Sequence, residues 1–414
     1  MVGAGLAGLS AAVSLTKAGF AVTLSEAAPH AGGRCRSYHD AKLGLTIDNG
    51  NHLLLSGNRR ARAYLRTIGA EDRLHGPDRA AFDFVDLRDG ARWTVRPNRG
   101  LLPWWVLRRT RRVPGTRAAD YLPLARLLGA NGAATLGQRL PTDGVLWERL
   151  LEPFFVAALN TPAAEGSARL AGAIVAGTLA KGAGACRPLV ARPTLGAAFV
   201  TPALDWLARH GATIRYGRRL RALEQSGGQL AALAFGDGSV AVADEPVVLA
   251  LPAWTIAELL PDIVVPDRHQ AIVNAHFAGR PPPGAPPILG VVGGTAEWIF
   301  ALEDRLSVTI SAADRLCDVE REPLARAIWA DVAAALRLPD ALPPWQIVRE
   351  RRATFAATPA QDRRRPPAAT RLANLFLAGD WTRTGLPATI EGAVLSGETA
   401  ARLAARQNGH DGRR

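Results

Sequence analysis

The stretch Met1-Val-Gly-Ala-Gly-Leu-Ala-Gly8 at the start of the chain decides the fold. Its glycines follow the pattern G-x-G-x-x-G, and a helical run, the strand-like Ala21-Val-Thr-Leu-Ser25 and the acid Glu26 come after it. In a βαβ unit these glycines make a tight turn, admit a pyrophosphate to the backbone and let the helix pack on the strand. The helix N-terminus offers N–H groups to phosphates, and the acid accepts hydrogen bonds from a ribose. The segment therefore predicts a dinucleotide site formed by Gly3, Gly5, Leu6, Ala7, Gly8 and Glu26.

The strand that should precede this turn is short. Only Met1 and Val2 stand before the first glycine, whereas a strand usually has about five or six residues. This strand normally lies at the centre of the sheet, so its loss would weaken the cofactor site. We therefore expect the native chain to begin several residues upstream, with an apolar run that ends in Val2.

Two further stretches have the features of a second nucleotide-binding element. Ala31-Gly-Gly-Arg-Cys-Arg-Ser37 joins glycines, which permit close backbone approach, to an arginine that can reach a phosphate or a flavin oxygen. Leu375-Phe-Leu-Ala-Gly-Asp380 places a carboxylate at a strand end, and the helix that opens near Thr389 would direct N–H groups at a reduced flavin. Either stretch alone could be a plain turn; together they predict FAD. The residues assigned to it are Gly33, Arg34, Asn49, Gly50, Gly379, Asp380, Thr389, Ile390 and Glu391.

Composition excludes several classes of protein. With 414 residues, 48% of them hydrophobic and 21% charged, the chain is a folded protein of two or three domains. The net charge of +13 is almost all arginine, because only three of the 50 basic residues are lysines. These arginines are spread along the chain without a recognition module, so we predict no nucleic-acid partner. The three cysteines have no metal-like spacing, which predicts a reduced cytoplasmic protein and no metal site.

Taken together, the motifs resemble those of the flavin amine oxidase and phytoene desaturase superfamily. Nearly the whole chain is similar to one branch of it, the squalene-associated FAD-dependent enzymes described as hydroxysqualene dehydroxylases. The chain departs from many relatives at Asn51, where we expect Gln before the histidine. The stretches that carry the resemblance are Gly32-Gly-Arg-Cys-Arg-Ser37, Asp48-Asn-Gly-Asn-His52, Ala157-Ala-Leu-Asn-Thr-Pro162, Trp298-Ile-Phe300, Arg349-Glu-Arg-Arg-Ala-Thr-Phe-Ala-Ala-Thr-Pro359, Ala378-Gly-Asp-Trp-Thr382 and Thr384-Gly-Leu-Pro-Ala-Thr-Ile-Glu-Gly392.

The resemblance implies an α/β flavoprotein, of α+β two-domain type, in which a Rossmann-like FAD-binding domain is interleaved with a mixed sheet and helical substrate domain. It also implies that the main chain at Leu220 contacts the adenine. From the sequence pattern we expect residues 80–192 to be mainly helices with loops. The predicted ranges are 1–75, 195–260 and 370–405 for the FAD-binding domain, 76–194 and 261–369 for the substrate domain, and 406–414 for a polar tail.

The reaction implied by the resemblance is reductive. Ionisation of the allylic C–O bond of hydroxysqualene gives a cation, which a hydride from N5 of reduced FAD converts to squalene. His52 is the candidate general acid, with a purely structural histidine as the alternative. No cysteine lies near the C-terminal flavin motif, so the FAD should be noncovalent. The sequence does not identify the external reductant, for which NAD(P)H is the candidate. The alternatives are an isoprenoid desaturase, an amine oxidase and a flavin-free carrier of prenyl groups.

A membrane contact is also expected. Leu101-Leu-Pro-Trp-Trp-Val-Leu107 is followed by Arg108-Arg-Thr-Arg-Arg112, and such a segment can place apolar side chains among acyl chains and guanidiniums on anionic headgroups. A core-packed helix end with a solvated basic face is the alternative. The triterpene substrate implied by the resemblance favours the first interpretation. We thus expect a cytoplasmic protein, peripheral on the inner face of the cell membrane, that works with the upstream squalene-pathway synthases.

Overall fold

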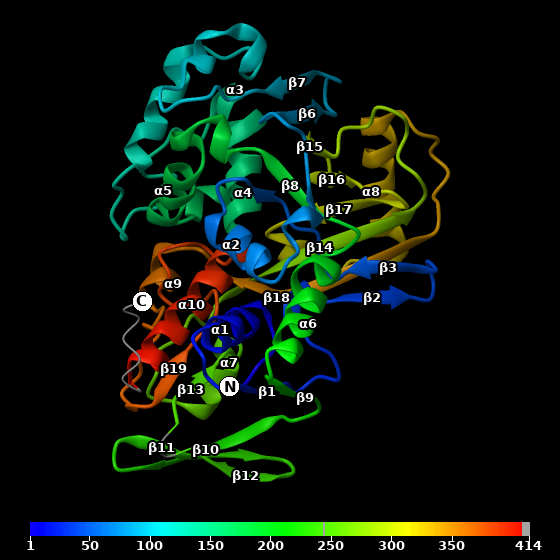
Figure 1. Ribbon diagram of the computed structural model, residues 1–414. Helices are drawn as coiled ribbons and strands as arrows, with labels where there is room; N and C mark the ends of the chain where they lie inside the picture. Colours follow the sequence, from blue (N-terminus) through cyan, green and yellow to red (C-terminus); the bar gives the residue numbers. More distant parts are fainter. Residues whose placement is uncertain (243–244, 408–414) are drawn as a thin grey trace.

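The computed structural model describes residues 1–242 and 245–407, so most of the predicted tail 406–414 lies outside the described residues. Figure 1 shows the N-terminus at a small parallel sheet, a larger sheet beside it, and a group of helices above the small sheet. None of the helices in the described ranges has the length and apolar character needed to cross a bilayer.

The small sheet forms around the N-terminal glycine turn. Strand β1 (Thr23–Ser25) pairs in parallel with β9 (Thr213–Arg215), and β13 (Val247–Leu249) pairs in parallel with β19 (Leu375–Leu377). Val2 bridges both pairs, through Ser25 on one side and Leu249 on the other. Val2 therefore occupies the central position that the expected first strand would take.

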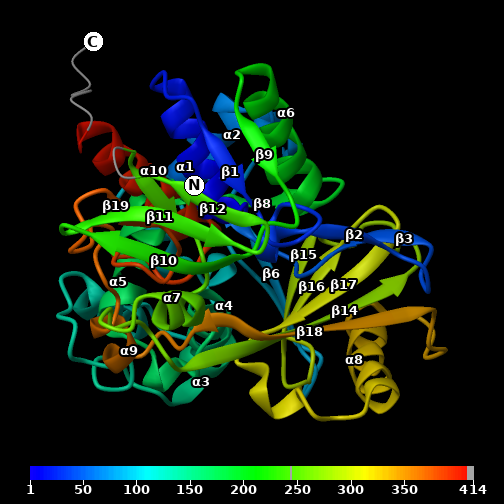
Figure 2. The same cartoon turned by 90° about the horizontal axis from the view of Figure 1, so that it is seen from below.

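Two helices from opposite ends of the chain pack on each other beside this sheet, as Figure 2 shows from below. They are α1 (Leu6–Lys17) and α10 (Ile390–Gln407). A Cβ at Gly397 would overlap the carbonyl oxygen of Ala7, so glycine is what permits the close approach. The other helices of this half are α2 (Arg59–Thr67), α6 (Thr201–Arg209) and α7 (Ala253–Leu259).

The larger sheet has seven strands in the order β18-β14-β17-β16-β15-β6-β7. Side chains alternate across it: Ile299 and Val308 pack toward helix α8 (Arg321–Leu336), whereas Trp298 and Phe300 line a cavity on the other face. The strands are β6 (Phe82–Asp86), β7 (Arg92–Val95), β14 (His269–Ala278), β15 (Ile288–Val292), β16 (Trp298–Ala301), β17 (Arg305–Ile310) and β18 (Trp345–Phe355).

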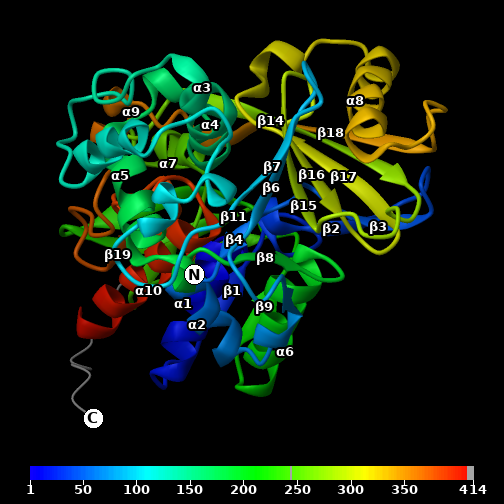
Figure 3. The same ribbon diagram turned by 90° about the horizontal axis from the view of Figure 1, so that it is seen from above.

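Helices cover the cavity side of the larger sheet, and Figure 3 shows them opposite α8. They are α3 (Gly144–Leu146), α4 (Glu152–Leu159), α5 (Ala168–Gly177) and α9 (Pro359–Arg363). A π-helical turn connects α3 to α4, and a 3-10 turn lies between α4 and α5. The remaining strands are β2 (Ser37–Asp40), β3 (Leu45–Asp48), β4 (Leu54–Leu55), β5 (Leu74–His75), β8 (Pro188–Ala191), β10 (Leu220–Ser226), β11 (Gln229–Phe235) and β12 (Gly238–Ala241).

The expectation of mainly helices and loops over residues 80–192 is wrong at three places. Residues 82–86 and 92–95 are strands β6 and β7 of the larger sheet, and residues 188–191 are strand β8. β6 pairs in parallel with β15, which comes about 200 residues later in the chain. Because strand formation here depends on that distant partner, local sequence alone did not reveal it.

Candidate functional site

Two of the three N-terminal glycines, Gly3 and Gly8, occupy positions that no other residue fits. Gly3 has a φ of +99°, and a Cβ on it would overlap the carbonyl oxygen of Ala250. A Cβ on Gly8 would overlap the carbonyl oxygen of Gly3, whereas a Cβ on Gly5 would meet no described atom within 4 Å. Helix α1 begins at Leu6 with no side-chain cap. Open space thus lies before a helix N-terminus, where an anion is stabilised.

The acidic residue predicted to bind the ribose lies beside this turn. Glu26 follows β1, and its carboxylate accepts hydrogen bonds from the N–H groups of Ala4 (2.7 Å) and Ala28 (2.8 Å). The backbone of Gly5 also bridges to Gly32, so the second glycine pair reaches the first. Leu220 opens β10 and buries its side chain in the apolar core, which leaves its main chain for any ligand contact.

A salt bridge joins the two predicted halves of the flavin site. Arg34 lies in a 3-10 turn (Gly33–Cys35), and its Nη2 is 2.7 Å from Oδ1 of Asp380, 346 residues away in sequence. The N–H of Gly379 donates to Oγ of Ser396 in α10, which ties the Gly-Asp strand end to that helix. The structure therefore brings together the guanidinium and the carboxylate that the sequence assigned to FAD.

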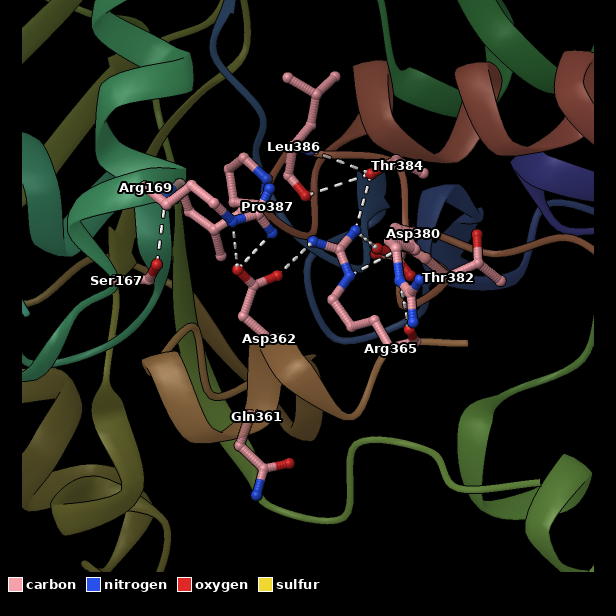
Figure 4. Close-up of polar contacts among 12 residues, drawn as sticks. Ser167, Arg169, Gln361, Asp362, Arg365, Asp380, Thr382, Thr384, Leu386 and Pro387 are labelled. Atoms are coloured by element: carbon pink, nitrogen blue, oxygen red, sulfur yellow. Dashed lines mark hydrogen bonds and ion pairs between the residues drawn. The ribbon is translucent and has the colours of Figure 1, made fainter. Parts of the chain in front are cut away.

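A buried arginine that the sequence did not single out holds the loop after Asp380. Figure 4 shows Arg365 directed into this loop. Its guanidinium donates to the carbonyl oxygens of Asp380 (3.0 Å) and Thr382 (2.9 Å) and to Oγ1 of Thr384 (2.7 Å). The carboxylate of Asp362, which is also buried, lies 3.1 Å from the Arg365 guanidinium and compensates its charge.

Asp362 also accepts from Arg169 of helix α5. The network in Figure 4 therefore connects the helical part of the molecule to the strand end that carries Asp380. Only the folded chain reveals this role, because Arg365 is one of many arginines and no sequence motif distinguishes it.

An apolar cavity between the two parts of the molecule has a volume of about 530 Å³, within the range of small-molecule sites. It extends from Asn51, His52 and the segment 386–391 at the flavin motifs to Trp105 and Tyr121 in the helical part. Most of its walls are aliphatic or aromatic. The aromatic residues include Phe84, Trp105, Tyr121, Phe155, Trp298 and Phe300.

Polar groups gather on one wall of the cavity. Asn51 donates to Oγ1 of Thr309 (3.2 Å) and to Oδ1 of Asn274, which also accepts from Thr309 (2.8 Å). Asn274 in turn donates to the carbonyl oxygen of Asn49, and a Cβ on Gly50 would meet the Asn274 amide at 3.1 Å. Asn274 and Thr309 hold the predicted flavin segment 48–52 in place. The sequence did not suggest them.

The start of helix α10 forms another part of the cavity. Oγ1 of Thr389 accepts the N–H of Gly392 at 3.1 Å, and Ile390 begins the helix. Glu391 lines the cavity, but its two oxygens accept from the N–H groups of Arg60 and Ala61 at the start of α2. Its carboxylate is therefore used to position α2, and the proposed contact with a flavin remains a prediction.

His52 lines the cavity, and its surroundings favour the neutral ring. Burial and the positive charge of Arg34 together lower its pKa to about 4. The carboxylate of Asp380 raises the pKa, but by less than these two effects lower it. A neutral imidazole has no proton of suitable acidity to give at neutral pH. The structure thus gives no support to His52 as an acid that is protonated before the reaction.

We expect His52→Gln to leave the shape of the pH profile of kcat/KM unchanged between about pH 5.5 and 8. The reason is that the ring stays neutral over this whole interval. Measurement of kcat/KM as a function of pH for the wild type and the variant checks this expectation. An ionisation near pH 6.5 that disappears in the variant would show that His52 carries the essential proton.

Glu297, next to cavity-lining Trp298, is a partly buried residue whose carboxyl group has an unusual pKa. Burial raises its pKa to about 7, against a hydrogen bond from the N–H of Ser311. In the unfolded chain the group ionises near pH 4.3. The native state therefore binds the extra proton between these values, and stability falls as the pH rises from about 4 to 7.

We expect Glu297→Gln to remove this loss of stability at higher pH. At pH 8 the variant should be more stable than the wild type by about 2 to 3 kcal/mol, and near pH 4 the difference should vanish. Urea unfolding at both pH values measures it. Glu303→Gln, at an exposed side chain, is the matched control and should change little. A Glu297→Gln effect independent of pH would contradict this assignment.

The residues present fit FAD at three points. The space before α1 suits a pyrophosphate, because a Cβ at Gly5 would meet no protein atom. Glu26 lies where the adenosine ribose of a dinucleotide is bound in such folds. The Arg34–Asp380 pair joins the two flavin motifs, and the start of α10 lines the cavity, where a flavin ring could contact a substrate.

Comparison with known proteins agrees with this geometry. The family model for flavin containing amine oxidoreductases matches residues 6–405. The hydroxysqualene dehydroxylase of Zymomonas mobilis is 53% identical over 98% of both chains, and that of Sinorhizobium fredii is 54% identical over 98% of this chain and 97% of its own. Cyclohexylamine oxidase from Brevibacterium oxydans has the same fold, with a TM-score of 0.70, 15% identity and 98% of each chain covered.

Proposed function

Because the chain belongs to the flavin-containing amine oxidoreductases, and among them to the hydroxysqualene dehydroxylases, we propose that it converts hydroxysqualene into squalene. The protein is an FAD-dependent oxidoreductase. The observation that carries the proposed substrate is the long apolar cavity, which ends in a few polar groups beside the flavin motifs. A triterpene alcohol matches such a cavity, because it has one hydroxyl group on a hydrocarbon chain.

The proposed reaction replaces a hydroxyl group by hydrogen. The hydroxyl takes up a proton and leaves as water, and the allylic cation that remains accepts a hydride. FAD, when bound in its reduced form, supplies that hydride. Each turnover consumes one proton and one hydride, so an external donor must re-reduce the flavin, and NAD(P)H remains the candidate for it.

The chain itself has two tasks in this reaction. The amide of Asn51 and the hydroxyl of Thr309 lie on the polar wall and can hold the hydroxyl group of the substrate. The aromatic faces of Trp298 and Phe300 exclude water and stabilise positive charge on the hydrocarbon. Water must be excluded because it would return the cation to the alcohol.

The cavity argues against oxidation of an amine. Among the described residues that line it, Glu391 is the only carboxylate, and that carboxylate already accepts from two backbone amides. Arg59, Arg60 and Lys181 also line the cavity. A protonated amine would meet positive charge there without a free carboxylate to pair with it.

The test compares the two directions of electron flow. Protein reduced under anaerobic conditions should turn hydroxysqualene into squalene, detected by mass spectrometry. Oxidised protein should keep its flavin absorption when mixed with putrescine, cyclohexylamine or a polyene precursor such as phytoene. Flavin bleaching by one of these compounds, without squalene formation in the first assay, would replace the proposal by an oxidase or desaturase.

We further infer that the protein meets its substrate as a peripheral protein on the inner face of the cell membrane. A triterpene alcohol partitions into lipid rather than into water. An enzyme that takes up such a molecule through an apolar cavity gains access to it most readily from the bilayer surface.

A further inference from the structure

An apolar surface stands out at the end of the helical part, in the segment coloured cyan at the upper left of Figure 1. Leu101 is 74% exposed, Leu102 79%, Leu107 69% and Leu122 72%. Trp104 and Leu128 are exposed beside them in sequence. We call these six residues the leucine surface. So many exposed large apolar side chains within 28 residues mark an interaction site.

Positive charge surrounds this surface. Residues 96–130 contain eight arginines and one aspartate, a net charge of +7 out of +13 for the whole chain. Arg108 and Arg111 lie over the ring of Trp104, at 5.7 and 4.9 Å from its centroid. Apolar side chains bordered by arginines match the boundary between acyl chains and anionic headgroups.

The surface is held in a defined shape. The buried side chain of Asn98 donates to the carbonyl oxygen of Leu102 (2.9 Å) and accepts the N–H of Trp105 (3.0 Å). The ring of Trp105 packs edge-on against Tyr121 at 5.3 Å. The exposed leucines are therefore presented by a fixed loop and not by a loose one.

The inner side of the same elements lines the cavity. Trp105, Tyr121 and Leu124 contribute to its walls, whereas their neighbours Trp104 and Leu122 face outward. Residues adjacent in sequence thus face the outer surface and the cavity.

We propose that the leucine surface docks on a bilayer that contains anionic lipid, with its leucines among the acyl chains and its arginines on the headgroups. The outer end of the cavity then lies at the membrane surface. The docking is independent of catalysis, and only its purpose, the uptake of a lipid-soluble substrate, rests on the proposed function.

The test is co-sedimentation of the full-length FAD-loaded protein with vesicles. The protein should bind vesicles of phosphatidylcholine mixed with phosphatidylglycerol at least about tenfold more tightly than pure phosphatidylcholine, and about 0.5 M salt should remove most of that preference. The triple variant Leu101→Ser, Leu102→Ser, Leu107→Ser should lose at least about tenfold in binding to the mixed vesicles. Val264→Ser with Val319→Ser changes exposed apolar residues outside this surface and should bind like the wild type.

Flavin absorption and circular dichroism identify any variant that fails to fold. If the triple variant fails to fold, the single variant Leu101→Ser takes its place. Wild-type protein that stays in the supernatant with both vesicle types would overturn the proposal, as would a triple variant that binds normally. A wild-type dimer that the triple variant converts to monomers, without vesicle binding, would assign the surface to a second copy. Squalene formation from detergent-solubilised substrate should persist in the triple variant, so failure to dock and failure of the proposed reaction are distinguishable.

Discussion

Replacing Gly5 by alanine should strongly weaken FAD binding without unfolding the protein, whereas replacing Gly8 by alanine should destabilise the fold itself. At Gly5 the new methyl group meets no protein atom within 4 Å, and the backbone φ of −72° suits any residue. It would occupy the space that a pyrophosphate needs at the N-terminus of α1. At Gly8 the methyl group overlaps the carbonyl oxygen of Gly3, so helix α1 must move away from the sheet.

We expect Gly5→Ala to weaken FAD binding by about 100-fold, or about 2.7 kcal/mol, with little change in the stability of the FAD-free protein. Gly8→Ala should cost the FAD-free protein about 3 kcal/mol or more. Flavin fluorescence titration and urea unfolding measure the two quantities. Gly236→Ala, at a site with open space and an ordinary φ, is the control. Normal FAD affinity in Gly5→Ala would show that the cofactor does not approach this turn.

The second large effect is expected at Asp362. Removing its charge by Asp362→Asn leaves the fully buried guanidinium of Arg365 without its counter-ion. Loss of one partner of a buried ion pair typically costs about 3 to 5 kcal/mol. Because Arg365 also holds the carbonyl oxygens of Asp380 and Thr382, the variant should release FAD more readily as well.

Urea unfolding and the rate of FAD release check this prediction. Asp318→Asn is the matched control, because the Arg351–Asp318 pair is exposed on both sides and such pairs contribute only about 0 to 1 kcal/mol. Equal stability losses in the two variants would mean that the network in Figure 4 does not hold the loop.

The parts that could be predicted from the sequence are those whose residues lie close together in it. The glycine turn with its following helix, strand and acid predicted the dinucleotide fold, and the flavoprotein family, the α/β two-domain class and FAD are confirmed by the comparisons. The two flavin motifs predicted a joint site, and Arg34 and Asp380 are indeed paired in the structure.

The parts that could not be predicted depend on tertiary contacts. Strand β6 has its partner about 200 residues away in β15, so its short sequence resembled a loop. Asn274 and Thr309 act only because β14 and β17 lie side by side under the segment that carries Asn51. The low pKa of His52 follows from burial next to Arg34, and nothing in the local sequence indicates that burial.

The most direct measurement is a single turnover of the FAD-reduced protein with hydroxysqualene in the absence of oxygen. We expect the flavin to be oxidised as squalene appears, with one squalene formed for each reduced FAD. Recovery of all the hydroxysqualene while the flavin remains reduced would contradict it.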